Sequence, residues 1–285
     1  MSVPAVLDLL RCPLCGQGFA DDGGGVRCAT GHRFDLARQG YLNLLGSRPP
    51  AHADTAAMVA ARARFLASGA YSPVADALVA AARAGLAAAR SSRTAAPALL
   101  EAGAGTGYYT AALLEGLGGR AVALDISVAA ARRAARAHPA AAAVVADAWA
   151  GLPLGDGVVD VVASVFAPRN PAEFARVLRP DGVLVVVTPR SAHLQELRAA
   201  LGLLDVDPVK QERLAAGLAD GFTPAGEVDV RFEAAWSRAR VVDLVAMGPN
   251  AFHLDDAAVR ERAAGLPDPV TTTVAVAVST WRPRG

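Results

Sequence analysis

Three cysteines and a histidine near the N-terminus have the residue types and the spacing of a metal site. Two residues separate Cys12 from Cys15, twelve separate Cys15 from Cys28, and three separate Cys28 from His32. Structural zinc takes four Cys or His ligands at the corners of a tetrahedron, and three Cys with one His is a standard set. A glycine-rich hairpin at residues 21–25 can bring the two halves of the set together. The pattern therefore predicts one Zn²⁺ site within residues 1–36.

The same four residues allow two other interpretations, which are buried thiols beside a surface histidine and a reactive dithiol. A redox C-x-x-C pair usually opens a helix in a βαβ unit, and no such unit is apparent around Cys12. A filled zinc tetrahedron has no open position for catalysis. We therefore expect residues 1–36 to serve structure and RNA recognition.

A glycine-rich turn follows the first of a series of short apolar runs that begin at residue 98. An acid, Glu101, comes just before three alternating glycines, Gly103, Gly105 and Gly107. Such glycines let a strand turn sharply into a helix and let a ligand approach the backbone. Dinucleotide sites favour G-x-G-x-x-G, whereas the third position counted from Gly103 is Tyr108. The pattern favours a ligand with an amino group and a sulfonium over one with a pyrophosphate.

Acids also end the next two apolar runs. Asp125 can hold both hydroxyls of a ribose, and Asp147, with Ala148 beside it, can accept a hydrogen bond from an adenine amino group. Three acids at three successive strand ends around one glycine turn resemble the class I methyltransferases and predict S-adenosylmethionine as cofactor. A doubly wound domain with another ligand is the alternative. The candidate cofactor-binding set also includes Tyr109, Ile126 and Phe166.

The elements that position these residues follow from the alternation of apolar runs with helical stretches. This alternation predicts an α/β fold, a Rossmann-like class I methyltransferase with a doubly wound sheet. We expect residues 37–96 to form a connector with helices near 54–67 and 73–90, and residues 97–285 to form the methyltransferase domain. Seven strands are expected, at residues 98–101, 121–124, 143–146, 158–165, 183–188, 227–233 and 271–281.

The candidate catalytic residues begin after the fourth expected strand, whose end faces the transferred methyl in this fold. Phe166 can stack on a base there, and Arg169 or Asn170 can hydrogen-bond the edge of that base. Asp54 is the candidate proton acceptor. The alternative is that the two prolines and the asparagine of residues 166–171 only form a turn.

Composition and charge narrow the class of protein. The 285 residues are 53% hydrophobic with a net charge of +1, but residues 1–100 hold ten Arg and six Asp with no Lys or Glu. A polyanion would prefer this basic third, although a codon bias toward G and C also explains the arginines. The chain lacks a signal peptide and an apolar run of roughly 18 residues. We expect a cytoplasmic protein with no membrane partner and reduced cysteines.

Several segments in chain order resemble the RlmA-type 23S rRNA guanine-N1 methyltransferases, and the likeness covers almost the whole chain. It is greatest to the tylosin-resistance branch. The only departures noted are Ala102 and Ala104, where relatives often have Ile and Cys. The matching segments are the Cys12/Cys15/Cys28/His32 set and residues 34–35, 37–45 (ARQGYLNLL), 54–58, 101–110 (EAGAGTGYYT), 166–171 (FAPRNP), 188–194 and 245–249 (VAMGP).

The resemblance implies methylation of guanine N1 in the hairpin 35 loop of 23S rRNA, at position 748 or 745, and a contribution to macrolide resistance. A homodimer is a possible oligomeric state, which the resemblance does not decide. Two alternatives come from other classes of protein. A small-molecule methyltransferase would share the cofactor site but needs no zinc module. A nucleic-acid-binding protein without catalysis would not need the three acids Glu101, Asp125 and Asp147.

Overall fold

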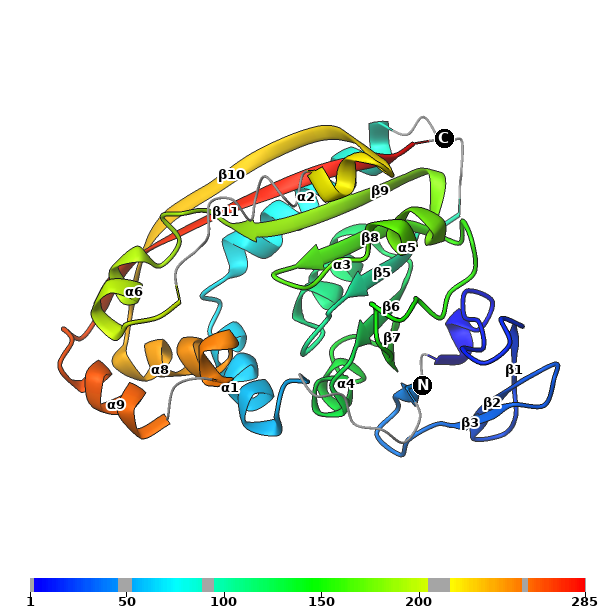
Figure 1. Cartoon of the computed structure of the whole chain (residues 1–285), viewed down its shortest axis with the longest axis horizontal. Coiled ribbons are helices and arrows are strands. Elements are labelled where there is room, and N and C mark those ends of the chain that lie inside the picture. Colours follow the sequence, from blue (N-terminus) through cyan, green and yellow to red (C-terminus); the bar gives the residue numbers. More distant parts are fainter. Residues whose placement is uncertain (1–2, 46–52, 89–94, 205–215, 253–255, 285) are drawn as a thin grey trace.

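An eight-stranded sheet runs through the centre of the protein, in the order β10-β11-β9-β8-β5-β6-β7-β4 (Figure 1). The computed structural model describes residues 3–45, 53–88, 95–204, 216–252 and 256–284. Neighbouring strands from β4 to β9 are parallel, and β11 is antiparallel to both β9 and β10. The strands are β4 (Leu42–Asn43), β5 (Ala98–Ala102), β6 (Arg120–Asp125), β7 (Ala141–Val145), β8 (Val159–Val165), β9 (Leu178–Pro189), β10 (Phe222–Trp236) and β11 (Val270–Pro283).

The chain order reverses between β5 and β8, which are hydrogen-bonded neighbours although they are distant in sequence. Open α/β sheets bind ligands at this kind of switch point, outside the carboxyl ends of the strands. Every residue of β5, β7 and β8 is buried. Helices cover both faces of such parallel strands, so their sequences are continuous apolar runs. The fold therefore places the glycine turn after β5 at the expected ligand site.

The seven expected strands are confirmed, but the expected count was wrong by one because β4 adds an eighth. β4 comes from the expected connector and pairs in parallel with β7 through Leu42 and Val144. Two residues are too short a run to read as a strand from sequence. Because β4 belongs to the main sheet, the expected connector contributes to the main fold. The exact domain boundaries stay a prediction.

Two helices from the same expected connector pack against the main sheet or the helices beside it. The Thr55 side chain caps α1 (Ala56–Ala67) by accepting a hydrogen bond from Met58 N at 3.2 Å. The second helix, α2 (Ser72–Ala88), packs against β9 and β11. It approaches the sheet closely, since a Cβ on Gly85 would lie 2.7 Å from a methyl of Val183. The expected helices near 54–67 and 73–90 are thus confirmed.

The remaining helices each lie between two successive strands of the chain. Among the described residues, no single helix is long and apolar enough to cross a membrane. Only the pair formed by α1 and α2 has that length and apolar character together, and the two helices are bent by 83° relative to each other. The remaining helices are α3 (Tyr108–Leu117), α4 (Val128–Ala134), α5 (Pro171–Val177), α6 (Gln195–Leu201), α8 (Arg238–Ala246) and α9 (Asp256–Ala264).

The N-terminal module is a small antiparallel sheet of three strands, β1 (Phe19–Asp21), β2 (Gly25–Cys28) and β3 (Arg33–Asp35). A short helical turn, η1 (Val3–Val6), precedes it. Both valines of this turn are buried in one core cluster with residues of β5, β6 and β7. The Arg120 guanidinium also donates hydrogen bonds of 2.7 and 2.6 Å to the two carboxylate oxygens of Asp8. The module is therefore attached to the sheet by apolar packing and by an ion pair.

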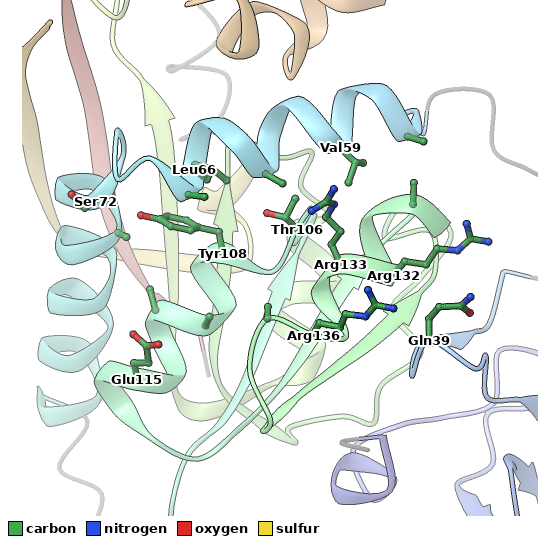
Figure 2. A pocket seen from close by; sticks show the side chains of 18 of the residues that line it. Gln39, Val59, Leu66, Ser72, Thr106, Tyr108, Glu115, Arg132, Arg133 and Arg136 are labelled. Carbon is green, nitrogen blue, oxygen red and sulfur yellow. The ribbon is translucent and has the colours of Figure 1, made fainter. Parts of the chain in front are cut away.

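A groove with a volume of about 980 Å³ lies between α1, α3 and α4 (Figure 2). Three arginines, Arg132, Arg133 and Arg136, line one end together with Gln39, and Glu115 lies at the other end. Arg132 and Arg133 are in the last turn of α4, and Arg136 follows the end of that helix. The groove thus has a basic end beside the connector and an acidic end along α3.

Candidate zinc and cofactor sites

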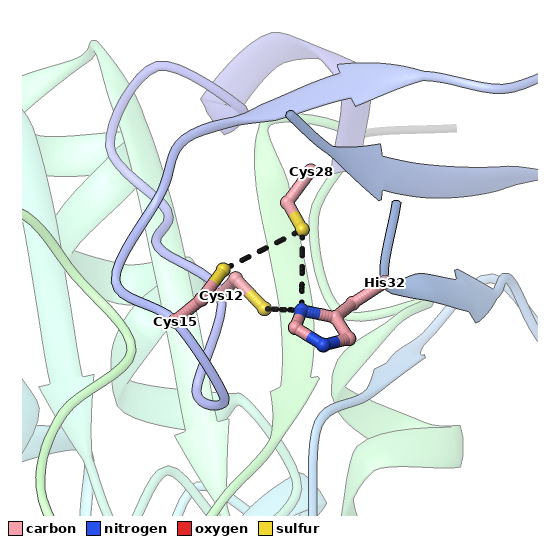
Figure 3. A group of neighbouring side chains, drawn as sticks. All are labelled: Cys12, Cys15, Cys28 and His32. Carbon is pink, nitrogen blue, oxygen red and sulfur yellow. Dashed lines mark hydrogen bonds between the residues drawn. The ribbon is translucent and has the colours of Figure 1, made fainter. Parts of the chain in front are cut away.

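The four predicted zinc ligands converge from two loops (Figure 3). Their ligand atoms all lie within 4.8 Å of one another. His32 Nδ1 is 3.6 Å from Cys12 Sγ and 3.5 Å from Cys28 Sγ, and 3.6 Å separates Cys15 Sγ from Cys28 Sγ. A zinc tetrahedron with bonds of about 2.1–2.3 Å has edges of roughly 3.5–3.8 Å. The donor set and its geometry therefore fit one structural zinc ion, and all four residues belong to it.

Thr30 is a member of this cluster that the sequence analysis missed. Its hydroxyl lies 2.9 Å from Cys15 Sγ and 3.1 Å from Cys28 Sγ. Burial of the Cys28 thiol opposes its ionisation, but hydrogen bonds from Thr30, Cys15 and the backbone outweigh burial and lower its pKa to about 6. The thiolate is the form that binds zinc. A hydroxyl close to a Cys pair has no distinctive spacing, so the sequence carried no signal for Thr30.

The backbone after β5 has no room for side chains at the glycine turn. Gly103, Gly105 and Gly107 have φ values of 75°, 54° and 79°, a conformation that costs glycine little. A Cβ on Gly103 would lie 2.5 Å from Ala167 Cβ, and one on Gly107 would lie 2.9 Å from Ala134 Cα. The turn is therefore a narrow cradle whose backbone amides a ligand can approach.

Two of the three predicted acids lie beside this turn, Glu101 fully buried and Asp125 half-buried. Glu101, at the end of β5, accepts a hydrogen bond from the Thr110 hydroxyl, and burial raises the pKa of Glu101 to about 8. Asp125 ends β6, and its carboxylate accepts hydrogen bonds from Gly105 N at 2.7 Å and from Ser127 N at 2.8 Å. Burial also raises the pKa of Asp125. Buried carboxyls of this kind are stabilised as carboxylates by a cationic or hydroxyl-bearing ligand.

The unliganded protein is expected to lose stability through Glu101 as the pH rises from about 5 to about 7.5. Burial raises the pKa of Glu101 to about 8 in the folded protein, against an ordinary value of 4.5 for a glutamate in an unfolded chain. In that window the folded state holds the proton and the unfolded state releases it, so a rise in pH favours unfolding. The urea concentration at the midpoint of unfolding should be lower at about pH 7.5 than at about pH 5 for the wild type. Glu101→Gln should reduce this difference.

The control for this prediction is Glu115→Gln, which changes an exposed glutamate on the neighbouring helix α3. That variant should keep the pH dependence of the wild type. If Glu101→Gln and the wild type lose stability equally between the two pH values, Glu101 is not protonated in the unliganded protein.

The third predicted acid and its neighbour lie at the end of β7. Asp147 accepts a hydrogen bond from Trp149 N at 2.9 Å, and the Ala148 carbonyl accepts one from Asn170 Nδ2 at 3.1 Å. Trp149 is 65% exposed, and sequence analysis gave it no role. An exposed indole at the carboxyl edge of the sheet offers a flat surface on which a base can stack.

Tyr109 and Ile126 complete the predicted cofactor set. The Tyr109 hydroxyl is buried, and no hydrogen-bond partner for it exists among the described residues. Buried polar atoms are rarely left without a partner, so a bound ligand is the natural partner for this hydroxyl. Ile126 is half-buried directly after Asp125. The orphaned hydroxyl, the glycine cradle, the buried Glu101 and the half-buried Asp125 together fit S-adenosylmethionine.

Phe166 lies at the end of β8 in an unusual conformation. Its φ of 52° is in the left-handed region, which costs a non-glycine residue free energy and is commonest at functional sites. The ring is 40% exposed. It stacks on the His193 ring at 5.9 Å between centroids, and the Tyr71 ring lies 6.0 Å away at a tilt. The backbone thus holds one aromatic face toward the carboxyl edge of the sheet.

Tyr71 and His193 form a buried pair behind Phe166 that the sequence analysis did not assign to the site. His193 Nδ1 accepts a hydrogen bond from Ala275 N at 3.2 Å, so the ring proton lies on Nε2, 3.2 Å from the Tyr71 oxygen. Burial lowers the pKa of His193 to about 4, so the ring is neutral. Because the Tyr71 oxygen accepts from His193, its own hydrogen is available to a ligand. Tyr71, Phe166 and His193 come from three distant segments, so no local sequence pattern could have identified them as one group.

Two of the three candidate catalytic residues lie together in the loop after β8. Burial lowers the pKa of Arg169 to about 10, and its buried Nη1 lacks a hydrogen-bond partner within the described part of the chain. The Asn170 side chain caps α5 by accepting from Glu173 N at 3.4 Å, and it also donates to the Ala148 carbonyl. The Asn170 side chain therefore has a structural task, whereas Arg169 has an unused donor.

Asp54, the third candidate catalytic residue, lies at the start of α1. Its carboxylate is ion-paired with Arg62, and its carbonyl accepts a hydrogen bond of 2.7 Å from the Ser127 hydroxyl beside the β6 turn. Arg62 also donates to the Met247 carbonyl at 2.7 Å, and a Cβ on Gly105 would lie 3.1 Å from its Nη1. Arg62 therefore ties α1 to the end of α8 and lies against the glycine turn.

A doubly wound sheet with a glycine cradle, acids at three strand ends and a Cys₃His cluster defines an S-adenosylmethionine-dependent methyltransferase with an N-terminal zinc ribbon. Two family models match the chain, "RlmA, N-terminal" over residues 10–49 and "Methyltransferase domain" over residues 100–186. The chain belongs to the RlmA family of 23S rRNA (guanine-N1)-methyltransferases.

Two relatives match over nearly their full lengths. A Micromonospora griseorubida protein, provisionally described as a 23S rRNA (guanine-N(1)-)-methyltransferase, is 50% identical over 98% of this chain and 99% of its own. The 23S rRNA (guanine(748)-N(1))-methyltransferase of Streptomyces fradiae is 43% identical over 98% of both chains. A solved methyltransferase in complex with the Haloferax volcanii Trm112 activator aligns with a TM-score of 0.48 and 21% identity, over 83% of this chain and all of its own.

Proposed function

We propose that the protein methylates N1 of a guanine in the hairpin 35 loop of 23S rRNA, with position 748 favoured over 745. The observation that carries this proposal is the 43% identity, over 98% of both chains, to an enzyme named for guanine 748. Methylation in that loop contributes to resistance against tylosin-type macrolides in our proposal. A homodimer stays an expectation that sedimentation of the purified protein tests.

The residues around the glycine turn hold the cofactor in this proposal. When bound, S-adenosylmethionine supplies an electrophilic methyl group. Glu101 is buried beside the glycines, where its carboxylate attracts the amino group and the sulfonium. Asp125 holds the ribose hydroxyls, and Asp147 with Ala148 receives the adenine amino group. The Tyr109 and Tyr71 hydroxyls have a hydrogen to donate, which suits the carboxylate of the methionine end.

The loop after β8 receives the guanine. Phe166 offers its exposed face for stacking, which requires a base splayed out of its helix because paired bases hide N1. The unused Arg169 donor is suited to guanine O6. A cation at O6 stabilises the negative charge that develops on the ring as N1 loses its proton. The proton leaves to water or to Asp54, and for the latter the ion pair with Arg62 must open.

The proposal is tested by mapping methylation in the ribosomes of a host with an unmodified hairpin 35. Reverse transcriptase stops at N1-methylguanine because the methyl group blocks the pairing edge. We expect a stop at position 748 when the wild-type gene is expressed and a much weaker one with Asp125→Ala, which loses charge-assisted hydrogen bonds to the ribose worth roughly 1–3 kcal/mol. Asp220→Ala, which changes an exposed aspartate just before β10, is the matched active control.

Two results would contradict the proposal. One is the absence of any stop in hairpin 35 although the purified protein binds S-adenosylhomocysteine in a calorimeter. The other is the transfer of labelled methyl groups to a small-molecule fraction rather than to RNA, which would favour a small-molecule methyltransferase.

A further inference from the structure

The groove between α1, α3 and α4 is not used by the cofactor site described above. Its basic end is formed by Arg132, Arg133 and Arg136 together with Gln39 (Figure 2). Thr106, inside the glycine turn, also lines the groove. The groove therefore leads from the connector that follows the zinc ribbon to the turn at which the cofactor site begins.

The three groove arginines are available for a ligand. All three are exposed, and no ion pair to any of them occurs within the described ranges. The basic residues of the N-terminal third differ in this respect. Arg33 is ion-paired with Asp22 and Asp35 of the ribbon itself. Arg62 pairs with Asp54 and Arg64 with Asp243. Much of the positive charge that sequence alone assigned to RNA binding is thus neutralised within the protein, while the charge of the groove is not.

We propose that the basic end of this groove binds the phosphates of the rRNA strand that flanks the target guanine, an inference that rests on the proposed function. Guanidinium groups match phosphate oxygens with two parallel hydrogen bonds. Three guanidiniums within one turn of α4 and the residues just after it can follow successive phosphates of a single strand. Gln39 adds an amide that can hydrogen-bond a sugar or a base edge.

The walls of the groove support a nucleotide chain as its occupant. The α1 side is formed by Ala56, Val59 and Ala63, which are small and apolar. Such a wall can accept the flat face of a sugar while the arginines hold the backbone. The acidic end at Glu115 repels phosphates, so it limits the strand to the basic end beside Thr106. This orientation leads the strand toward the cofactor turn.

The test compares two triple variants that remove the same charge. The first is Arg132→Gln, Arg133→Gln and Arg136→Gln, and the second is Arg231→Gln, Arg240→Gln and Arg260→Gln, in β10, α8 and α9. Binding of a hairpin 35 transcript is measured against salt concentration, with S-adenosylhomocysteine present. Each lost phosphate contact lowers the slope of log K against log salt by about 0.7, so the groove variant should lose about two units of slope.

The groove variant should also bind the transcript on the order of tenfold to a hundredfold more weakly near 0.15 M salt. Its KM for RNA should rise while its kcat at saturating RNA and its affinity for S-adenosylhomocysteine stay at the wild-type values. The second triple variant should match the wild type. Because Arg136 lies beyond the end of α4, Arg136→Gln alone leaves the helix intact and should lower the slope by about 0.7.

Equal salt slopes for the groove variant and the wild type would overturn the inference. So would a change in oligomeric state without a change in slope, which would identify the groove as a contact between two copies of the chain. If the wild type itself neither binds nor methylates the transcript, the proposed function fails instead. The two failures are therefore distinguished by the wild-type measurement.

Discussion

Replacing Cys28 with serine is expected to remove the zinc ion and unfold the N-terminal ribbon. Cys28 ends β2, and its sulfur lies within 3.6 Å of both Cys15 Sγ and His32 Nδ1. A serine hydroxyl cannot replace the thiolate, because it is a hard donor that stays protonated. Structural zinc contributes roughly 10–16 kcal/mol of binding free energy in small modules, and that free energy is also folding free energy. We expect zinc affinity to fall on the order of a thousandfold or more.

The measurement is zinc per chain by elemental analysis, combined with hydrogen exchange of β1, β2 and β3. Ala29→Ser introduces the same side chain at the next, exposed position and should keep one zinc ion. Protection in the main sheet should largely persist in Cys28→Ser, since the strands do not depend on the metal. A full zinc content in that variant would show that the Cys₃His cluster is not the metal site.

Replacing Arg169 with glutamine is expected to lower kcat about 100- to 1000-fold, the usual effect of removing one donor to a developing oxyanion. The structure gives this arginine a buried Nη1 without a partner among the described residues, and its pKa of about 10 keeps it charged at neutral pH. An unpartnered buried cation is costly to a protein, and a guanine O6 would offset that cost. Arg169→Lys keeps the charge without the planar fork and should retain part of the rate.

Single-turnover rates at saturating RNA and cofactor measure this effect directly. Affinity for S-adenosylhomocysteine should stay at the wild-type value, because Arg169 faces the base and not the cofactor in this proposal. Arg231→Gln, an exposed arginine of β10, is the charge-matched control. If Arg169→Gln loses cofactor affinity in proportion to its rate, the residue belongs to the cofactor site.

Sequence reasoning found the elements whose physical signal is local. The parallel strands are buried on both faces, so each is a continuous apolar run. The four zinc ligands and the glycine turn are short motifs with fixed spacing. The start of β9 was missed because Pro180, Asp181 and Gly182 are typical of a turn. In the structure they lie within the strand, where the pairing with β8 is irregular.

Other features depend on contacts between distant segments and leave little local signal. The Tyr71–His193 pair and the hydrogen bond from Arg62 to the Met247 carbonyl each join residues more than a hundred positions apart. Asn170 is an intermediate case. An asparagine before a proline is a known helix start, and that signal could have identified its capping of α5.

The packing of the first residues limits where this protein can be recombined with its relatives. Leu9 and Leu10 are almost fully buried in the same core cluster as β5 and β6, and the Arg11 amide donates to the Pro153 carbonyl at 2.9 Å. These residues precede the first zinc ligand but belong to the core of the methyltransferase. A chimaera that exchanges zinc ribbons should therefore keep its own residues up to Arg11 and join the foreign ribbon from Cys12 onward. A crossover at the start of the chain would exchange part of the core as well.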